Sequence, residues 1–445
     1  MFHRDIIYQL RAWSNRPNRK PLILRGARQV GKTTVVKLFA QEFDQFILLN
    51  LEKADQRALF AADVRFQDLL MAIFLNAKQK RYGGRTLIFI DEIQNSPHAV
   101  SMLRYFKEEA EDLFVIAAGS LLETVLDQKL PYPVGRIEYM LLHPVSFREF
   151  LLAKGELASL ELIELPPPPP YAHSQLMALF KEYLTIGGMP QIVEQYLQHA
   201  DLSTLTPIYE SLINSYREDI EKYAPSLAQM HYLRFILSVG FQIAGTRVTI
   251  ENFGGSGYKY REMREAFSTI EKTLLFQLVY PTSEVLMPAI PKENRKPRLH
   301  AVDTGLINFS VHLIKDILTA PDLTDVYKGR IAEHITGQEL LAASYSVLHK
   351  LKFWEREKPQ SSAEIDYLYA YQGKLIPIEV KSGHAGKLRS MHAFIDLSSL
   401  KLGVRVWQNA FSIESAQTQG GTRYQLINLP FYLVHRLEHI LAGFI

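Results

Sequence analysis

The sequence contains no cysteine among its 445 residues. This absence excludes disulfides, thiolate zinc sites and cysteine nucleophiles, and it is typical of proteins in a reducing cytosol. Long apolar runs are also missing: the longest, Leu113–Leu122, is far shorter than the roughly 20 residues that span a bilayer. Residues 1–13 carry charges among their apolar residues, unlike a signal peptide. We therefore expect a soluble, cytoplasmic protein without a membrane partner.

The chain has almost no excess of charge of either sign. Lys and Arg total 50 against 47 acidic residues, and 47% of all residues are apolar, an ordinary globular composition. Binding to nucleic acid would therefore require a local basic patch, because no global field attracts it. The length is sufficient for two or three domains, each with its own core.

The first third of the sequence alternates strand-like and helical segments. Short, fully apolar strands separated by helices predict a parallel sheet covered on both faces. The strands are expected at residues 21–24, 46–51, 87–90 and 114–118. Residues 1–150 are therefore predicted to form an α/β domain.

Three further segments follow. Residues 151–228 are predicted to be helical, with an interruption at the prolines of 166–170. Residues 229–324 read as helix, glycine-rich turn, helix and β-ribbon, the order of a winged helix. Residues 325–445 begin with a helix, and strands are expected at 346–351, 365–371 and 375–380. A tight turn at Gln372–Gly373 joins the last two of these.

A phosphate-binding motif follows the first predicted strand. Residues 26–33 match G-x-x-x-x-G-K-[ST], and a helical segment comes directly after them. In such a loop the backbone N–H groups surround an anion, Lys32 reaches the β- and γ-phosphates, and the Thr33 hydroxyl ligates Mg²⁺. The residues expected to bind ATP are Gly26, Ala27, Arg28, Gln29, Val30, Gly31, Lys32, Thr33 and Thr34.

Two acidic residues end the strand at residues 87–90. Ligands in such sheets bind at the carboxyl ends of the strands, where Asp91 is suited to hold magnesium. Glu92 beside it is suited to accept a proton from an attacking water, which favours hydrolysis over transfer to a second substrate. The pair alone also fits an acidic end of a core strand. Together with the loop at 26–33 it predicts Mg²⁺-dependent ATP hydrolysis.

Two more residues join this site by inference. Ser120 follows the strand at 114–118 and is suited to sense the γ-phosphate or to position the water. Arg136, after Gly135, is suited to contact phosphate in its own or a neighbouring subunit. On sequence alone, a single serine or arginine equally fits an ordinary surface position.

These motifs, with 144–150, 187–190, 303–306 and 378–381, resemble a prokaryotic family of AAA-superfamily ATPases that carries a C-terminal domain of unknown function. The resemblance covers nearly the whole chain. It implies a helical lid after the ATPase core, a winged helix, and a restriction-nuclease-like C-terminal domain. In its light Ser120 is the sensor and Arg136 contacts nucleotide. Ala118 departs from the threonine usual in the family, and the proline run resembles an insertion.

The last segment carries a second group of chemically suggestive residues. Glu379 and Lys381 are two apart on a predicted strand, so both project from one face. With Asp366 on the preceding strand and Glu333 on a helix upstream, they match the arrangement of PD-(D/E)xK nucleases, which hold a divalent metal. A solvated charge pair is the alternative interpretation. Pro377 indicates an edge strand or a strand start.

Two basic segments are candidates for contact with double-stranded DNA. On the predicted helix at 258–275 an apolar stripe faces the core, which leaves Lys259, Arg261, Arg264 and Lys272 outside. The loop at 292–298 would be the wing of the winged helix. A solvated helix with a charged hairpin tip is the alternative, because several glutamates dilute the charge.

The sequence thus predicts an α/β protein with a P-loop NTPase sheet, a helical lid, a winged helix and a restriction-endonuclease-like C-terminal domain. The first functional hypothesis is an ATPase that drives the last two modules, on DNA or within a homo-oligomer. The second is an ATP-regulated nuclease with its own divalent metal. The third is a nucleotide-latched switch that binds a protein partner without significant turnover.

Overall fold

The computed structural model describes residues 2–61, 64–81, 83–119, 135–164, 167–222, 224–314, 317, 329–357, 363–381 and 388–444. These residues form two compact units. The first unit comprises Met1–His143 with the short segments Lys272–Leu274 and Tyr345–Leu348, and the second comprises the rest of the chain. The expected division of residues 151–445 into three domains stays a prediction.

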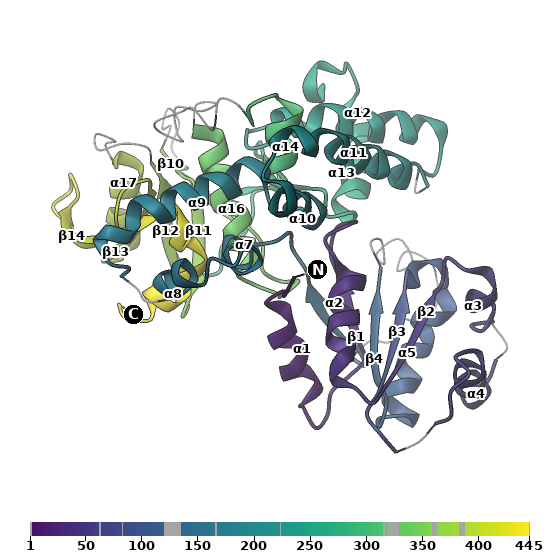
Figure 1. Ribbon diagram of the computed structural model, residues 1–445. Helices are drawn as coiled ribbons and strands as arrows, with labels where there is room; N and C mark the ends of the chain where they lie inside the picture. The colour runs from purple at the N-terminus through teal and green to yellow at the C-terminus, as the bar shows by residue number, and fades with distance from the viewer. Residues whose placement is uncertain are drawn as a thin grey trace. The chain divides into compact units, whose positions relative to one another are not determined.

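The first unit contains a five-stranded parallel sheet in the order β2-β3-β4-β1-β5 (Figure 1). The α/β prediction is confirmed, and four of the strands lie where the apolar runs placed them. The fifth, β5, follows residues outside the described part and was not predicted. The strands are β1 (Leu22–Arg25), β2 (Gln45–Asn50), β3 (Thr86–Asp91), β4 (Phe114–Ala118) and β5 (Glu138–Leu141).

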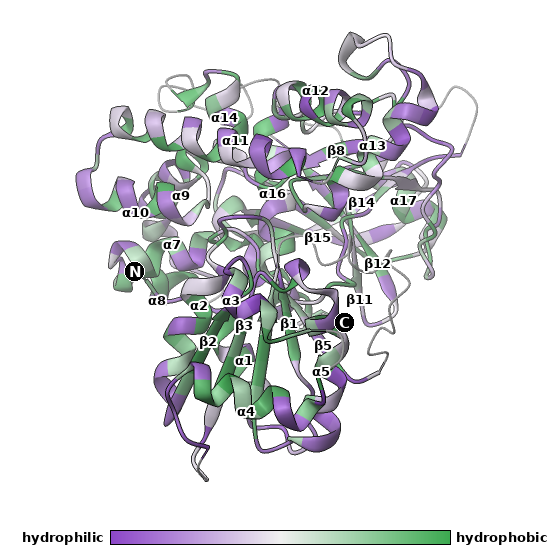
Figure 2. Cartoon of the chain, turned by 90° about the vertical axis from the view of Figure 1, so that its right-hand side faces the viewer, coloured by the Kyte–Doolittle hydropathy of each residue, from purple (hydrophilic) through white to green (hydrophobic). Residues whose placement is uncertain are grey.

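Helices cover both faces of this sheet, as buried apolar strands require. One face packs against α4 (Phe66–Asn76) and α5 (Pro97–Glu109). On the other face lie α1 (Ile6–Ser14) and α2 (Lys32–Phe39), and Trp13 contacts Phe114 with ring centroids 6.3 Å apart. Figure 2 shows the strands in green, as the apolar layer between the helices. A short helix, α3 (Ala54–Ala58), follows β2.

The second unit begins with a series of helices. A capping box between Ser146 and Glu149 starts the first of them. The helical stretch predicted from residue 151 is broken before its prolines into two helices, because the chain turns at Gly155 with a φ of 78°. The helices are α7 (Phe147–Lys154), α8 (Leu157–Glu164), α9 (His173–Ile186), α10 (Pro190–His199), α11 (Thr206–Glu221), α12 (Leu227–Ile243), α13 (Tyr260–Lys272) and α14 (Thr304–Ser310). Pro169, in the proline run, has the polyproline II angles of φ −57° and ψ 141°.

An antiparallel ribbon of two strands follows α13. It consists of β6 (Phe276–Val279) and β8 (Arg298–Ala301), which pair along their whole length. The predicted order of helix, turn, helix and ribbon is therefore present.

The C-terminal part of the second unit is built on a mixed sheet in the order β11-β12-β13-β15-β14. Its helices are α16 (Arg330–Ala342), α17 (Arg389–Ser398) and α18 (Leu437–Leu441). The strands are β11 (Tyr367–Tyr371), β12 (Lys374–Val380), β13 (Leu402–Trp407), β14 (Ser412–Gln417) and β15 (Arg423–Pro430). A small second sheet joins β7 (Pro281–Thr282), β9 (Phe353–Glu355) and β10 (Glu364–Ile365).

Two predictions for this part were wrong. Residues 346–351 do not form a strand, and the strand lies just after them, at β9. Pro377 does not lie on an edge strand or at a strand start, because β12 pairs on both sides. Pairing with β13 begins only at Ile378, so the missing N–H of Pro377 costs no hydrogen bond on that side.

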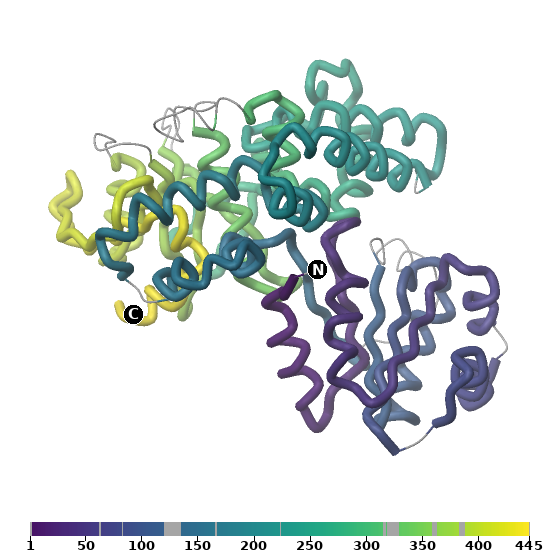
Figure 3. The backbone as a smooth tube through the Cα atoms, viewed as in Figure 1, coloured from purple at the N-terminus to yellow at the C-terminus, as the bar shows by residue number. Residues whose placement is uncertain are grey.

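Segments far apart in sequence lie side by side in the second unit. In Figure 3 the teal tube of α9 passes the yellow C-terminal tube, and α9 meets the segment Phe431–Arg436 through Phe180, whose ring stacks on that of Phe431 with centroids 5.9 Å apart. In the described part of the chain, every helix falls short of the length and apolarity needed to cross a membrane.

Candidate functional site

The loop between β1 and α2 has the backbone geometry that anion binding requires. Gly31 has φ 95° and ψ 22°, a left-handed conformation that glycine adopts without strain. At Gly26 an added Cβ would lie 2.6 Å from the carbonyl oxygen of Leu142, so no larger residue fits. The loop then runs directly into the N-terminus of α2, whose free N–H groups and dipole favour an anion.

Lys32 is folded back onto this loop. Its Nζ donates to the carbonyl oxygens of Gly26 and Ala27, each at 2.9 Å, and the side chain is buried. The ammonium group is therefore positioned inside the loop, where a phosphate group would lie.

Thr33 and Asp91 are brought together from two elements. The Thr33 hydroxyl donates a 2.8 Å hydrogen bond to Asp91 Oδ2, although β4 separates the strands β1 and β3. Burial raises the pKa of Asp91, while the Thr33 hydrogen bond and the nearby charge of Lys32 act in the opposite direction. Two adjacent oxygen ligands, one of them a carboxylate beside a phosphate-binding loop, fit Mg²⁺.

Glu92 is held by a residue that sequence reasoning missed. Its backbone is left-handed, with φ 54° and ψ 43°, and Gln94 Nε2 donates to Glu92 Oε2 at 2.5 Å. Gly119, at the end of β4, makes room for Gln94, since an added Cβ would lie 2.2 Å from Gln94 Oε1. The short spacing of Glu92 and Gln94 was visible in the sequence, but the turn that joins their side chains was not.

The other two predicted residues are not part of this cluster. Ser120 lies outside the described residues. Arg136 precedes β5 at the amino end of the sheet, because Glu138 pairs with Leu22 at the start of β1. The nucleotide loop lies at the opposite end, and Arg136 instead donates to Glu108 at 3.0 Å. The structure thus does not bring Arg136 to the loop of its own subunit.

In the second unit, two of the predicted metal ligands contact an arginine. Arg298 of β8 contacts Asp366 Oδ1 at 3.2 Å and Glu333 Oε2 at 3.7 Å, and it also pairs with Glu364. The three carboxylates keep the pKa of this guanidinium above its usual value despite its burial. Among the described residues, no group of three His, Asp or Glu side chains has the geometry to hold a metal ion. The predicted second metal site is therefore unsupported in this conformation.

Glu379 and Lys381 form a close ion pair beside these carboxylates. Lys381 Nζ lies 2.9 Å from Glu379 Oε1, while Asp366 Oδ2 accepts from the Val380 N–H between them at 2.8 Å. Burial first, and then the charge of Asp366, raises the pKa of both Glu379 and Glu333. All four predicted residues thus converge, with an added arginine.

The strand register places two further polar residues, which the sequence did not indicate, beside Glu379. Glu379 is in register with Arg405 on β13, which is in register with Asn428 on β15. Arg405 Nε donates to Asn428 Oδ1 at 2.7 Å. Only the strand register places these residues in one row, since they are spread over 50 positions of the sequence.

The wing predicted to contact DNA is largely neutralised by its neighbours, and on the predicted helix Arg264 is paired too. Lys292 pairs with Glu357 at 2.6 Å, and Arg264 pairs with Glu293 at 3.1 Å. Arg298, at the end of the predicted wing, lies in the carboxylate cluster with its side chain only 15% exposed. The wing therefore offers less free positive charge to DNA than its lysines and arginines suggested.

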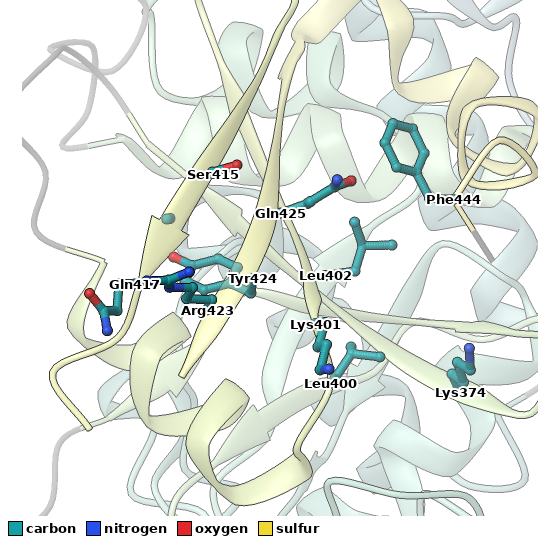
Figure 4. Close-up of a pocket in the computed structure, with 11 residues that line it drawn as sticks. Lys374, Leu400, Lys401, Leu402, Ser415, Gln417, Arg423, Tyr424, Gln425 and Phe444 are labelled. Atoms are coloured by element: carbon teal, nitrogen blue, oxygen red, sulfur yellow. The ribbon is translucent and has the colours of Figure 1, made fainter. Parts of the chain in front are cut away.

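A different concave surface combines basic residues that lack acidic partners. It lies at the starts of β12, β13 and β15, and it encloses about 660 Å³ (Figure 4). Lys374, Lys401 and Arg423 line it, and none of the three forms an ion pair with another described residue. Ser415, Gln425 and Phe444 add polar and aromatic groups. This surface suits an anionic ligand.

A buried polar network connects α9, α14 and α16. Tyr183 donates to Glu339 at 2.7 Å, and Gln338 bridges Tyr183 and Asp303 at 3.2 Å each. Asp303 Oδ2 also accepts from the Gly188 N–H at 2.6 Å. Burial raises the pKa of Glu339 to about 7 and that of Asp303 to about 6.

Models of three protein families match consecutive parts of the chain. Residues 18–151 match an AAA domain. Residues 177–316 match a domain of unknown function, DUF8612, and residues 328–432 match another, DUF4143. The middle match runs across the boundary expected between residues 228 and 229.

One curated relative is the replication factor C large subunit of Thermococcus kodakarensis, 26% identical over 230 residues. The match covers 48% of this chain and 43% of the relative, so the chain spans less than half of that protein.

Solved structures with partial similarity include a Walker-type ATPase of Pyrococcus abyssi, at 14% identity and a TM-score of 0.45, covering 70% of this chain and 96% of that one. The RuvB Holliday junction branch migration motor of Thermotoga maritima matches at 18% identity and a TM-score of 0.28, covering 66% and 93%. Likenesses at these TM-scores do not establish a shared fold for the whole chain.

The loop at Gly26–Gly31, the Thr33–Asp91 contact and the match over 18–151 agree with one another. The chain carries an AAA-type domain with a P-loop, followed by two domains of unknown function, and this homology supports ATP binding and hydrolysis with the magnesium that such ATPases usually use.

Proposed function

We propose that the first unit hydrolyses ATP with Glu92 as the general base. The observation that carries this proposal is the group of Lys32, Thr33, Asp91 and Glu92 at the carboxyl ends of β1 and β3. Lys32 and the loop N–H groups bind the β- and γ-phosphates, and Thr33 and Asp91 hold the magnesium. When bound, the ion offsets the charge that develops on the phosphate oxygens.

In the chemical step, the Glu92 carboxylate takes the proton of a water as its oxygen attacks the γ-phosphorus, and the bond to the β-phosphate oxygen breaks. The products are ADP and inorganic phosphate. The hydrogen bond from Gln94 leaves one oxygen of Glu92 to act as the acceptor. Gln94 is thus a positioning residue.

Hydrolysis drives or gates the second unit, in which residues 229–324 act as a winged helix and 325–445 as a nuclease-like module, in the cytoplasm. Double-stranded DNA is the proposed partner. The partial similarity to a replication factor C large subunit favours a DNA-related role. The concave surface at Lys374, Lys401 and Arg423 offers unpaired positive charge for phosphates. Arg136 contacts nucleotide in a neighbouring copy if the protein assembles into a homo-oligomer.

The test is ATP hydrolysis by the full chain with and without duplex DNA, in the wild type and in two variants. Lys32→Ala should abolish turnover by removing phosphate binding. Glu92→Gln should retain ATP binding and lose turnover by a factor on the order of 10² to 10⁴, the range of general-base catalysis. Hydrolysis by Glu92→Gln at the wild-type rate would sink the assignment of the base.

The same samples separate the two alternatives. A nuclease regulated by ATP would cleave DNA in the presence of divalent metal, and Lys381→Ala would abolish the cleavage. A nucleotide-latched switch would bind ATP tightly with negligible turnover, even with DNA present. Turnover stimulated by DNA without cleavage would favour the ATPase.

A further inference from the structure

Arg298 occupies the centre of the acidic group in the second unit. It contacts Glu333, Glu364 and Asp366, and its Nη1 also donates to the Asp366 carbonyl oxygen at 3.2 Å. The guanidinium carbon lies 4.8 Å from the centre of the Phe353 ring. One largely buried cation is therefore held by three carboxylates, a carbonyl and an aromatic face.

These contacts use the same oxygen atoms that a metal would need. Asp366 directs Oδ1 at Arg298 and accepts the Val380 N–H with Oδ2, so neither oxygen is free. Divalent cations such as Mg²⁺ and Ca²⁺ take carboxylate oxygens at about 2.0–2.6 Å, and a guanidinium between the carboxylates excludes that arrangement. The cluster therefore already has its cation.

Glu379 supplies an independent sign of a further ligand. Its side chain is 4% exposed, and Oε2 has no hydrogen-bond partner, whereas Oε1 pairs with Lys381. The β11–β12 pairing ends with Tyr367 opposite Ile378, and Asp366 and Glu379 are the next residues beyond that pair. A buried carboxylate oxygen without a partner is costly, and a cation shared with Asp366 would satisfy it.

We propose that Arg298 takes the place of a divalent cation in this cluster, and that a divalent cation binds between Asp366 and Glu379 only when Arg298 withdraws. This inference rests on the proposed nuclease-like role of residues 325–445, and it makes metal binding there depend on the position of Arg298. Arg298 belongs to β8, in the expected winged helix, whereas its acidic partners belong to the C-terminal segment. A partner that moves the β6–β8 ribbon therefore controls whether the site takes a metal.

The probe is Mn²⁺ binding to the full chain without nucleotide, counted by the loss of the free-ion electron paramagnetic resonance signal. Wild type and Asp366→Asn should bind the same number of ions. Arg298→Met, which keeps an unbranched apolar stem and removes the charged guanidinium, should gain one ion per chain. The double variant Arg298→Met with Asp366→Asn should lose that ion again.

Arg298→Lys is the matched control, because it retains a positive charge and should gain no ion. A wild-type protein that binds one more Mn²⁺ than Asp366→Asn would overturn the proposal, and this comparison does not require any Arg298 variant to fold. A folded Arg298→Met variant with unchanged stoichiometry would overturn it as well. ATP turnover, measured on the wild type, tests the proposed function separately, since it depends on Lys32 and Glu92.

Discussion

Gln94 donates a 2.5 Å hydrogen bond to the carboxylate of Glu92, and Gly119 leaves the space in which Gln94 lies. The residue proposed to accept a proton is therefore oriented by a neighbour two positions along the chain. The orientation depends on the end of β4 as well as on the end of β3.

We expect Gln94→Ala to lower kcat for ATP hydrolysis by about tenfold while KM for ATP changes little, because the base loses its orientation and the phosphate contacts remain. Steady-state phosphate release measures both constants. Gln94→Glu is a useful companion, since it places a second carboxylate against Glu92 and should also slow turnover. Faster turnover in Gln94→Ala would show that the hydrogen bond restrains Glu92 in an unproductive position.

Thr33 should control the magnesium requirement of hydrolysis. Removing its hydroxyl in Thr33→Ala takes away one proposed ligand and the hydrogen bond to Asp91. We expect the Mg²⁺ concentration for half-maximal rate to rise on the order of tenfold or more, and Thr33→Ser to behave like the wild type. A titration of the rate with Mg²⁺ at saturating ATP checks this. Equal requirements in all three proteins would remove Thr33 from the metal site.

Gly26→Ala adds only one methyl group but should weaken nucleotide binding strongly. The new methyl group would meet the Leu142 carbonyl at 2.6 Å, so the loop must shift away from its phosphate-binding shape. Fluorescent ATP-analogue binding should weaken at least tenfold, a change of about 1.4 kcal/mol. Gly83→Ala is the control, because an added Cβ there meets nothing within 4 Å. Equal affinity in both variants would contradict the role given to Gly26.

Glu339 should make stability depend on pH. Its folded pKa is raised to about 7 from 4.5, so the native state binds the proton more tightly than the unfolded state. The stabilisation is complete below the unfolded pKa and is lost as the pH rises through about 7, an effect on the order of 3 kcal/mol. Asp303, raised to about 6, contributes in the same direction.

Thermal unfolding of wild type and Glu339→Gln between pH 5 and pH 8 measures this effect. The amide stands in for the protonated carboxyl, so the variant should gain stability relative to the wild type as the pH rises. Tyr183→Phe removes the hydrogen bond to Glu339 without removing the carboxyl, and should keep the pH dependence. A constant difference between Glu339→Gln and wild type would show that Glu339 titrates normally.

Binding to duplex DNA should depend on the concave basic surface more than on the wing. The double variant Lys401→Glu, Arg423→Glu should weaken binding and reduce the salt dependence by about 0.9 in log K against log salt for each lost phosphate contact. Lys292→Glu, at a site already paired with Glu357, is the matched comparison. Fluorescence anisotropy at several salt concentrations measures the DNA affinity of both variants. A larger loss of affinity in Lys292→Glu would show that the wing is the DNA interface.

The nucleotide loop was accessible to sequence reasoning because its chemistry is local. Residues 26–33 are contiguous. The apolar strands before Thr33 and Asp91 are visible in the sequence and predict that both residues lie at the carboxyl end of the sheet. The place of Arg136 was not accessible, because it depends on β5, whose register with β1 puts the arginine at the far end of the sheet.

The second unit shows the same limit more strongly. Glu333, Asp366, Glu379 and Lys381 were identified from spacing, and the structure brings them together. Arg298 precedes Asp366 by 68 positions and was interpreted as part of an exposed basic wing. A charged residue on a predicted hairpin has no local signal of burial, and only the packing of β8 near α16 and β11 reveals its partners.

The contact between Gly26 and Leu142 has a mechanical consequence. Leu142 donates its N–H to the carbonyl of Arg25 at 2.8 Å, and its own carbonyl forms the wall against which Gly26 rests. His143 is the last residue of the first unit before the chain enters the second at Pro144. A rearrangement of the loop on nucleotide exchange would thus displace the Leu142 peptide, which lies two residues before Pro144, where the chain leaves the first unit.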